Sequence, residues 1–173
     1  MNKFFKFIII GILFATVAEF VLNILILKNI NSYLFTFIIY FTLLTFAYFL
    51  GKIINKIRKP YSEILYYIIA STFGLMFEWF LLGNAPWLNL DANQIGMFSF
   101  WAAVFMMPRI FCLKNENLNK LKKYIKVYFI IYAIILILLG FIIPESSKIF
   151  ILTLVITLGY TIMNVFYLWF FIK

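Results

Sequence analysis

The sequence predicts an all-α integral membrane protein, a single bundle of six transmembrane helices over residues 1–173 with both termini in the cytoplasm. Hydrophobic residues make up 66% of the 173 positions and charged residues only 12%, whereas soluble domains carry about 25% charged residues. Too few polar side chains are present to cover a surface in water. Six long apolar segments and an uneven distribution of lysine and arginine among the turns complete the prediction.

Each apolar segment is long enough to be a spanning helix, which needs about 20 mainly apolar residues. A polar turn at 28–32 separates the first two, Pro60 stops the second, and Ser62 is the expected N-cap of the third. Gly83 ends the third segment and Pro144 separates the last two. The expected helices run approximately over residues 4–27, 33–54, 62–82, 95–113, 124–143 and 149–172.

Lysine and arginine predict the orientation. With both termini inside, 13 of the 15 Lys and Arg residues fall on the inner side, and only Lys28 and Lys148 fall outside. Such an excess is typical of cytoplasmic loops, so the net charge of +9 does not indicate nucleic-acid binding. The first segment contains Glu19 and is too long for a cleaved signal peptide, so we treat it as the first helix. The expected location is the plasma (cytoplasmic) membrane, that is, the cell inner membrane.

Two carboxylates fall within the outer half of the expected spans. At a rise of 1.5 Å per residue, Glu19 lies about 5 Å and Glu78 about 9 Å above the bilayer centre. Each carboxylate costs about 2.5–3.5 kcal/mol near the core, so both should face the bundle interior. Their only candidate positive partners, Lys28 and Lys148, lie at turns. Both acids are therefore either protonated and hydrogen-bonded, or charged and met by a proton, a metal ion or an organic amine from outside.

The polar residues around Glu78 form the candidate site. Small and hydroxylated residues at helical spacing predict that the first, third, fourth and sixth helices line it. Carboxylates beside aromatic faces suit an organic cation. The expected ligand-binding residues are Glu19, Asn23, Glu78, Trp79, Asn84, Trp87, Asp91 and Gln94.

Several of these residues also have structural explanations. Asp91 and Gln94 match a capping box for the fourth helix. Asn84 follows Gly83 at a helix end. Trp87 suits the outer membrane interface, where we also expect Trp101.

Arg109 follows Pro108 in the inner half of the fourth helix, about 15 Å deeper than Glu78, so the two are not expected to pair. Its side chain is expected either to reach cytoplasmic lipid headgroups or Glu63, or to act as an inner gate that closes a polar pathway. We assign it as an inner gate or lipid contact.

The residue inventory disfavours most enzyme classes. The chain has no histidine and one cysteine, Cys112, which excludes an internal disulfide, a Ser-His-Asp triad and the usual zinc ligand sets. It contains no phosphate-binding glycine loop and no nucleophile elbow. No metal site and no cofactor is expected, and a non-enzymatic role is favoured over catalysis.

These observations favour a small transporter, or the substrate-binding membrane subunit of one, with an outward-facing acidic and aromatic site for a cation, proton or small organic amine. One alternative is a structural or assembly subunit whose polar stripes bind other transmembrane helices. Another is an intramembrane enzyme on a lipid-linked substrate, with Glu78 and Asp91 as acid–base groups. The expected partners are the lipid bilayer, the cationic ligand or proton, and other membrane subunits.

Overall fold

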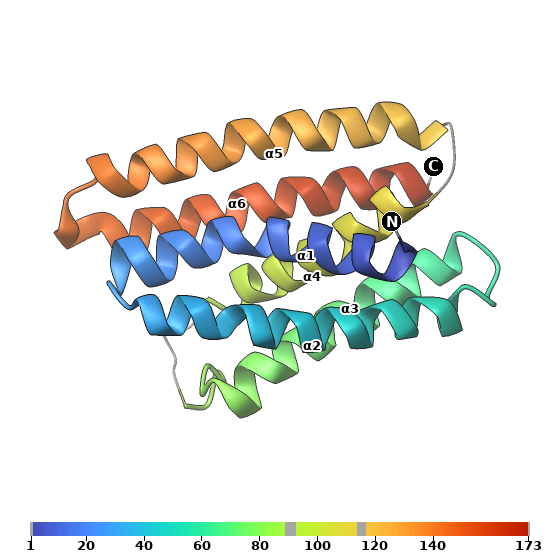
Figure 1. The fold of residues 1–173 in the computed structure, drawn as a ribbon, viewed down its shortest axis with the longest axis horizontal. Helices are drawn as coiled ribbons and strands as arrows, with labels where there is room; N and C mark the ends of the chain where they lie inside the picture. Colours follow the sequence, from blue (N-terminus) through green and yellow to red (C-terminus); the bar gives the residue numbers. More distant parts are fainter. Residues whose placement is uncertain (1, 89–92, 114–116, 173) are drawn as a thin grey trace.

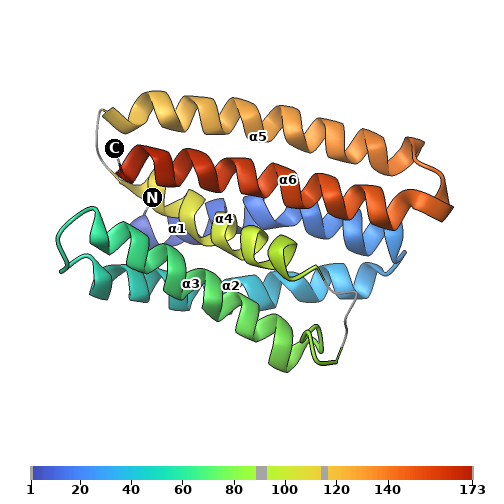
Figure 2. The ribbon, with the colours of Figure 1, turned by 180° about the vertical axis from the view of Figure 1, so that it is seen from behind.

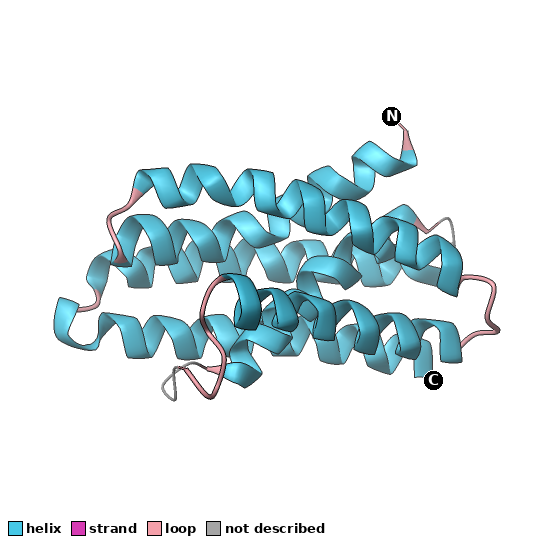
Figure 3. Ribbon diagram, turned by 90° about the horizontal axis from the view of Figure 1, so that it is seen from below, coloured by secondary structure: helices cyan, strands magenta, loops and turns pink. Residues whose placement is uncertain are grey.

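A computed structural model describes residues 2–88, 93–113 and 117–172. This part of the chain consists of helices joined by loops, with no strand (Figure 3). Six of its helical segments are long and apolar enough to cross a membrane. The elements are α1 (Lys3–Glu19), η1 (Phe20–Ile26), α2 (Ile30–Ile54), α3 (Tyr61–Leu81), α4 (Gln94–Cys112), α5 (Asn117–Ile142) and α6 (Glu145–Ile172), and η1 is a π-helix that directly continues α1.

The helices lie side by side along one axis, so the loops collect at the two ends of the bundle (Figures 1 and 2). One end holds the start of α1, the α2–α3 turn and the end of α6, and we call it the basic end. The other holds the α1–α2 turn, the end of α3 and the α5–α6 turn, with Lys28 and Lys148, and we call it the lysine-poor end. The basic segments that the sequence assigns to one side thus gather at one end.

Helix α4 forms the core of the bundle. Every residue from Ser99 to Ile110 is buried, and α4 packs mainly against α1, α3 and α6. Helix α5 packs on the outside, against α6 and η1 (Figure 1). Large apolar side chains such as Phe41, Ile131 and Leu158 are exposed on the outer helices. A surface of this kind is compatible with lipid tails and costly in water.

The helix bounds match the expected ones to within a few residues, with two exceptions. Helix α5 begins at Asn117 rather than near 124, and α6 begins at Glu145 rather than near 149. In the added turns of α5, Leu118 and Leu121 are buried while the lysines around them are exposed or half-buried. The helix therefore extends beyond its apolar run as an amphipathic segment.

Two expected helix caps are wrong. Helix α3 begins at Tyr61 after Pro60, and the buried Ser62 hydroxyl caps nothing and has no hydrogen-bond partner. Asn93 caps α4 by accepting a hydrogen bond from the Gly96 N–H at 2.8 Å, which replaces the expected capping box. Proline fits the first turn without losing a hydrogen bond, and asparagine is among the best N-caps.

Candidate functional site

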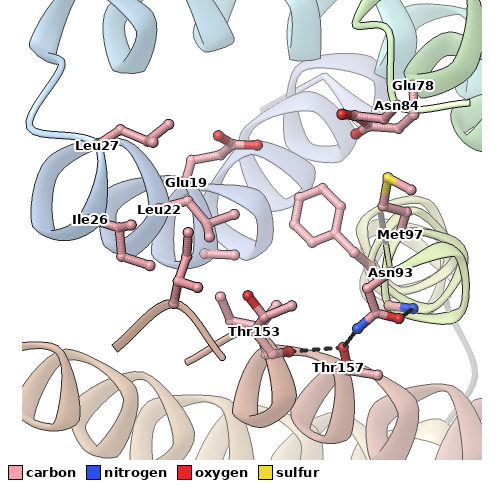
Figure 4. A pocket seen from close by; sticks show the side chains of 15 residues that line it. Glu19, Leu22, Ile26, Leu27, Glu78, Asn84, Asn93, Met97, Thr153 and Thr157 are labelled. Atoms are coloured by element: carbon pink, nitrogen blue, oxygen red, sulfur yellow. Dashed lines mark hydrogen bonds between the residues drawn. The ribbon is translucent and has the colours of Figure 1, made fainter. Parts of the chain in front are cut away.

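A cavity of about 410 Å³ lies at the lysine-poor end, between α1–η1, the end of α3, α4 and α6 (Figure 4). This volume falls within the roughly 300–1,000 Å³ of small-molecule sites. Leu27 and Ile149, both largely exposed, belong to its rim. The polar side chains that line it are Glu19, Glu78, Asn84, Asn93, Thr153 and Thr157.

Glu19 is the last residue of α1, and its carboxylate is held by two neutral donors. Tyr40 of α2 donates its hydroxyl to Oε1, and Asn23 donates its side-chain amide to Oε2 at 2.6 Å. Asn23 is buried within the π-helix η1. Short π-helical segments are rare and often occur at functional sites.

Glu78 lies near the end of α3 and is likewise held by neutral donors. Trp101 Nε1 donates to Oε1 at 3.0 Å, and Asn84 Nδ2 donates to Oε2 at 2.8 Å. Trp101 is buried, and it packs over Gly74, where an added Cβ would lie 2.4 Å from Trp101 Cγ. An indole N–H only donates, so Oε1 of Glu78 must accept.

A second layer of hydrogen bonds fixes the position of Asn84. Gln94 donates its amide to the Asn84 carbonyl at 2.9 Å and accepts a hydrogen bond from Trp79 Nε1 at 2.7 Å. Gly83, at φ 73°, ends α3 and turns the chain toward this position. Trp87 packs edge-on against Trp79, with ring centroids 5.5 Å apart, and is 61% exposed.

Neither pocket carboxylate has a cationic partner among the described residues. The ion pairs in this part of the chain involve only Glu63 and Glu145. Lys28 and Lys148, the lysines of this end, lie 3.7 and 2.9 Å from the same oxygen of Glu145. Both are thus paired away from the pocket acids.

The wall opposite the acids belongs to α4 and α6, and its polar groups pair with each other. Asn93 Nδ2 donates to Thr157 Oγ1 at 2.8 Å, and Thr157 donates to the Thr153 carbonyl at 2.9 Å (Figure 4). Further along the same two helices, Thr161 donates to Ser99 Oγ at 3.0 Å. The polar stripe of α6 is thus directed at α4 of the same chain.

At the basic end, a buried ion pair joins α3 to α4. Arg109 donates from Nε and Nη2 to the two carboxylate oxygens of Glu63 at 2.6 and 3.1 Å. Arg109 Nη2 also donates to Asn55 Oδ1 at 2.7 Å, and Tyr167 of α6 donates to Glu63 at 2.5 Å. The Tyr66 ring lies 4.4 Å from the guanidinium carbon. This arrangement ties four helices together.

The structure brings together only some of the residues expected from the sequence. Glu19, Glu78 and Asn84 line the cavity. Asn23 donates a hydrogen bond to Glu19, Gln94 donates one to the Asn84 carbonyl, and Trp79 donates one to Gln94. Trp87 lies beside Trp79 on the surface, and Asp91 lies outside the described residues.

Sequence reasoning missed Tyr40 and Trp101, the aromatic donors to the two acids. The expected interfacial position of Trp101 is wrong, because its side chain is buried in the core. Gly74, which leaves room for the indole ring, was the available signal. Reasoning from the sequence also missed Asn93, Thr153 and Thr157 as pocket residues.

No family model matches the chain, and neither a curated protein nor a solved structure gives a match. The described chain is all-helical, and its six long apolar helices are compatible with a multi-pass membrane protein.

Proposed function

We propose that this chain is a multi-pass protein of the plasma membrane that binds a cation in an outward-facing pocket, as a small transporter or as the substrate-binding membrane subunit of one. In this arrangement both termini are cytoplasmic and the basic end faces inward, as the positive-inside rule requires. The lysine-poor end, where the cavity lies, then faces outward.

One observation carries the proposal: two carboxylates from different helices line one cavity and receive only neutral hydrogen-bond donors from the described chain. Ionisable groups at membrane depth are costly and usually mark ligand or ion pathways. A cation from outside would offset the repulsion between the two acids, because both line the same cavity.

We propose that Arg109, which forms the buried ion pair with Glu63 at the basic end, acts as an inner gate at the other end of such a pathway. Its guanidinium is buried and bound to Glu63 rather than directed outward, which favours a gate over a contact with lipid headgroups. A gate predicts that Arg109→Met raises ligand leak through reconstituted vesicles in addition to lowering stability, whereas a purely structural clamp predicts lower stability without leak.

The assembly alternative draws on polar stripes that would bind other transmembrane helices. Here much of the α6 stripe is bonded to the α4 region of the same chain, through Thr157 with Asn93 and Thr161 with Ser99. Interhelical hydrogen bonds within one chain leave fewer polar groups for a partner helix. We therefore retain cation binding as the proposed function.

Thermal unfolding of the purified protein with and without added cations tests the proposal. A ligand at 100 times its dissociation constant stabilises the folded state by about 2.7 kcal/mol, so inorganic cations and small amines form the first panel. We expect at least one to stabilise the wild type and to lose this effect in the Glu19→Gln, Glu78→Gln double variant.

Glu145→Gln is the matched control, because it removes one negative charge from the same end of the bundle outside the cavity. It should leave ligand stabilisation intact. A double variant that is stabilised as strongly as the wild type would contradict the proposal, and so would a wild type that responds to no cation.

A further inference from the structure

We propose that the ligand is an organic ammonium ion with an apolar body, its charged group beside Glu19 and Glu78 and its body against Leu22, Ile26 and Phe100. This inference rests on the proposed function and names the substrate class of the same pocket. It selects among a proton, an inorganic cation and an amine by the chemistry of the lining.

The acidic wall offers acceptors that an ammonium group can use. Each of the four carboxylate oxygens accepts one hydrogen bond from Tyr40, Asn23, Trp101 or Asn84. A carboxylate oxygen has two acceptor positions, and an ammonium group carries up to three N–H donors. The built-in donors thus orient the two acids while one acceptor position on each oxygen stays open.

The rest of the lining is complementary to hydrocarbon. Eight of the 15 lining residues are apolar, among them Leu22, Ile26, Phe100 and Ile156 (Figure 4). A proton or a bare metal ion makes no use of this surface. Hard divalent cations also need six or more oxygen ligands, or keep several waters, whereas an alkyl or aryl body displaces water from apolar walls.

Two of the three polar side chains of the opposite wall, Asn93 and Thr157, already have hydrogen-bond partners within the chain. Asn93 donates to Thr157 and accepts from the Gly96 N–H, and Thr157 donates to the Thr153 carbonyl. Most of this wall, apart from the Thr153 hydroxyl, therefore accepts a body without polar groups. The described residues of the pocket supply no positive charge beside Glu19 and Glu78, and an ammonium group would supply it.

Calorimetric titration of the protein in lipid nanodiscs with methyl- to hexylammonium, Na⁺, K⁺, Mg²⁺ and the matching neutral alcohols tests the inference. Titrations of the Glu19→Gln, Glu78→Gln double variant subtract the partitioning of alkyl chains into lipid. We expect affinity to rise about fourfold for each added methylene until the cavity is filled. The alcohols should show no binding that depends on the two acids.

A pair of variants separates the apolar wall from the acids. Leu22→Ala should weaken hexylammonium binding about tenfold and methylammonium binding much less, because the longer body buries more apolar surface against this wall. Ile24→Ala, in the same π-helix but outside the cavity lining, should change neither.

The outcomes separate this inference from the proposed function. Acid-dependent binding of inorganic cations, with no gain from longer alkyl chains, would overturn the ammonium assignment and leave the proposed function standing. No acid-dependent binding by any cation would overturn both. Equal losses in the Leu22 and Ile24 variants would also contradict the ammonium assignment.

Discussion

Glu63 and Glu78 lie near opposite ends of the same helix, α3, and they differ in the charge of their hydrogen-bond donors. Glu63 is fully buried and receives two hydrogen bonds from the Arg109 guanidinium. Glu78 borders a cavity and receives one indole and one amide donor, both neutral. Glu19 on α1 repeats the second pattern, with a hydroxyl and an amide.

The difference separates a carboxylate that is neutralised within the chain from one that borders a cavity. A buried charge that is paired inside the chain completes a structural clamp, and losing one partner leaves the other unpaired. A carboxylate that borders a cavity and has only neutral donors among the described residues suits the cation binding that we propose. The two ends of α3 therefore suit two roles, a closed basic end and a binding site at the lysine-poor end.

The largest expected effect comes from breaking the inner pair. Arg109→Met or Glu63→Gln alone should lower the free energy of unfolding by about 3–5 kcal/mol, because each removes the closest ionic partner of a buried charge. The double variant should lose less than the sum of the two single losses. Chemical unfolding in detergent micelles measures this, and single losses below about 1 kcal/mol would contradict the clamp.

A smaller loss of stability is expected from a change in the packing of Trp101, the indole donor to Glu78. Gly74→Ala places a Cβ against Trp101, so the ring must shift and its hydrogen bond to Glu78 must change. We expect a loss of about 1–3 kcal/mol in stability and weaker ammonium binding, measured by unfolding and titration on the same sample.

Gly140→Ala is the matched control for this change. Its added Cβ would meet the flexible Leu25 side chain, away from the cavity, so ammonium affinity should stay at the wild-type value. Equal affinity losses in both variants would show that Trp101 does not position Glu78.

The fold followed from the sequence because apolar length alone determines which segments can cross a membrane. The bounds failed at the starts of α5 and α6, where the helix continues past its apolar run. In α5 the continuation rests on Leu118 and Leu121, two buried residues spaced for one helix face among lysines. A prediction of helix bounds from mean hydropathy misses such a segment, because its average composition is polar.

Of the residues that line the cavity, the sequence predicted Glu19, Glu78 and Asn84. Glu19 and Glu78 stand out in an apolar chain because charge at membrane depth is costly. Tyr40 and Trp101 do not stand out, because aromatic residues make up 22% of the sequence. Which aromatic side chain reaches a carboxylate depends on small residues opposite, as Gly74 is to Trp101, and on helix rotation, which is not visible in one sequence.

Ligand-induced infrared difference spectra in the carboxyl region test the central claim most directly. Adding an alkylammonium ion to the wild type should perturb carboxyl bands that disappear from the difference spectrum in Glu19→Gln and Glu78→Gln, while Glu145→Gln keeps them. If the bands are unchanged on ligand addition, or persist without both glutamates, the two acids do not receive their positive charge from outside.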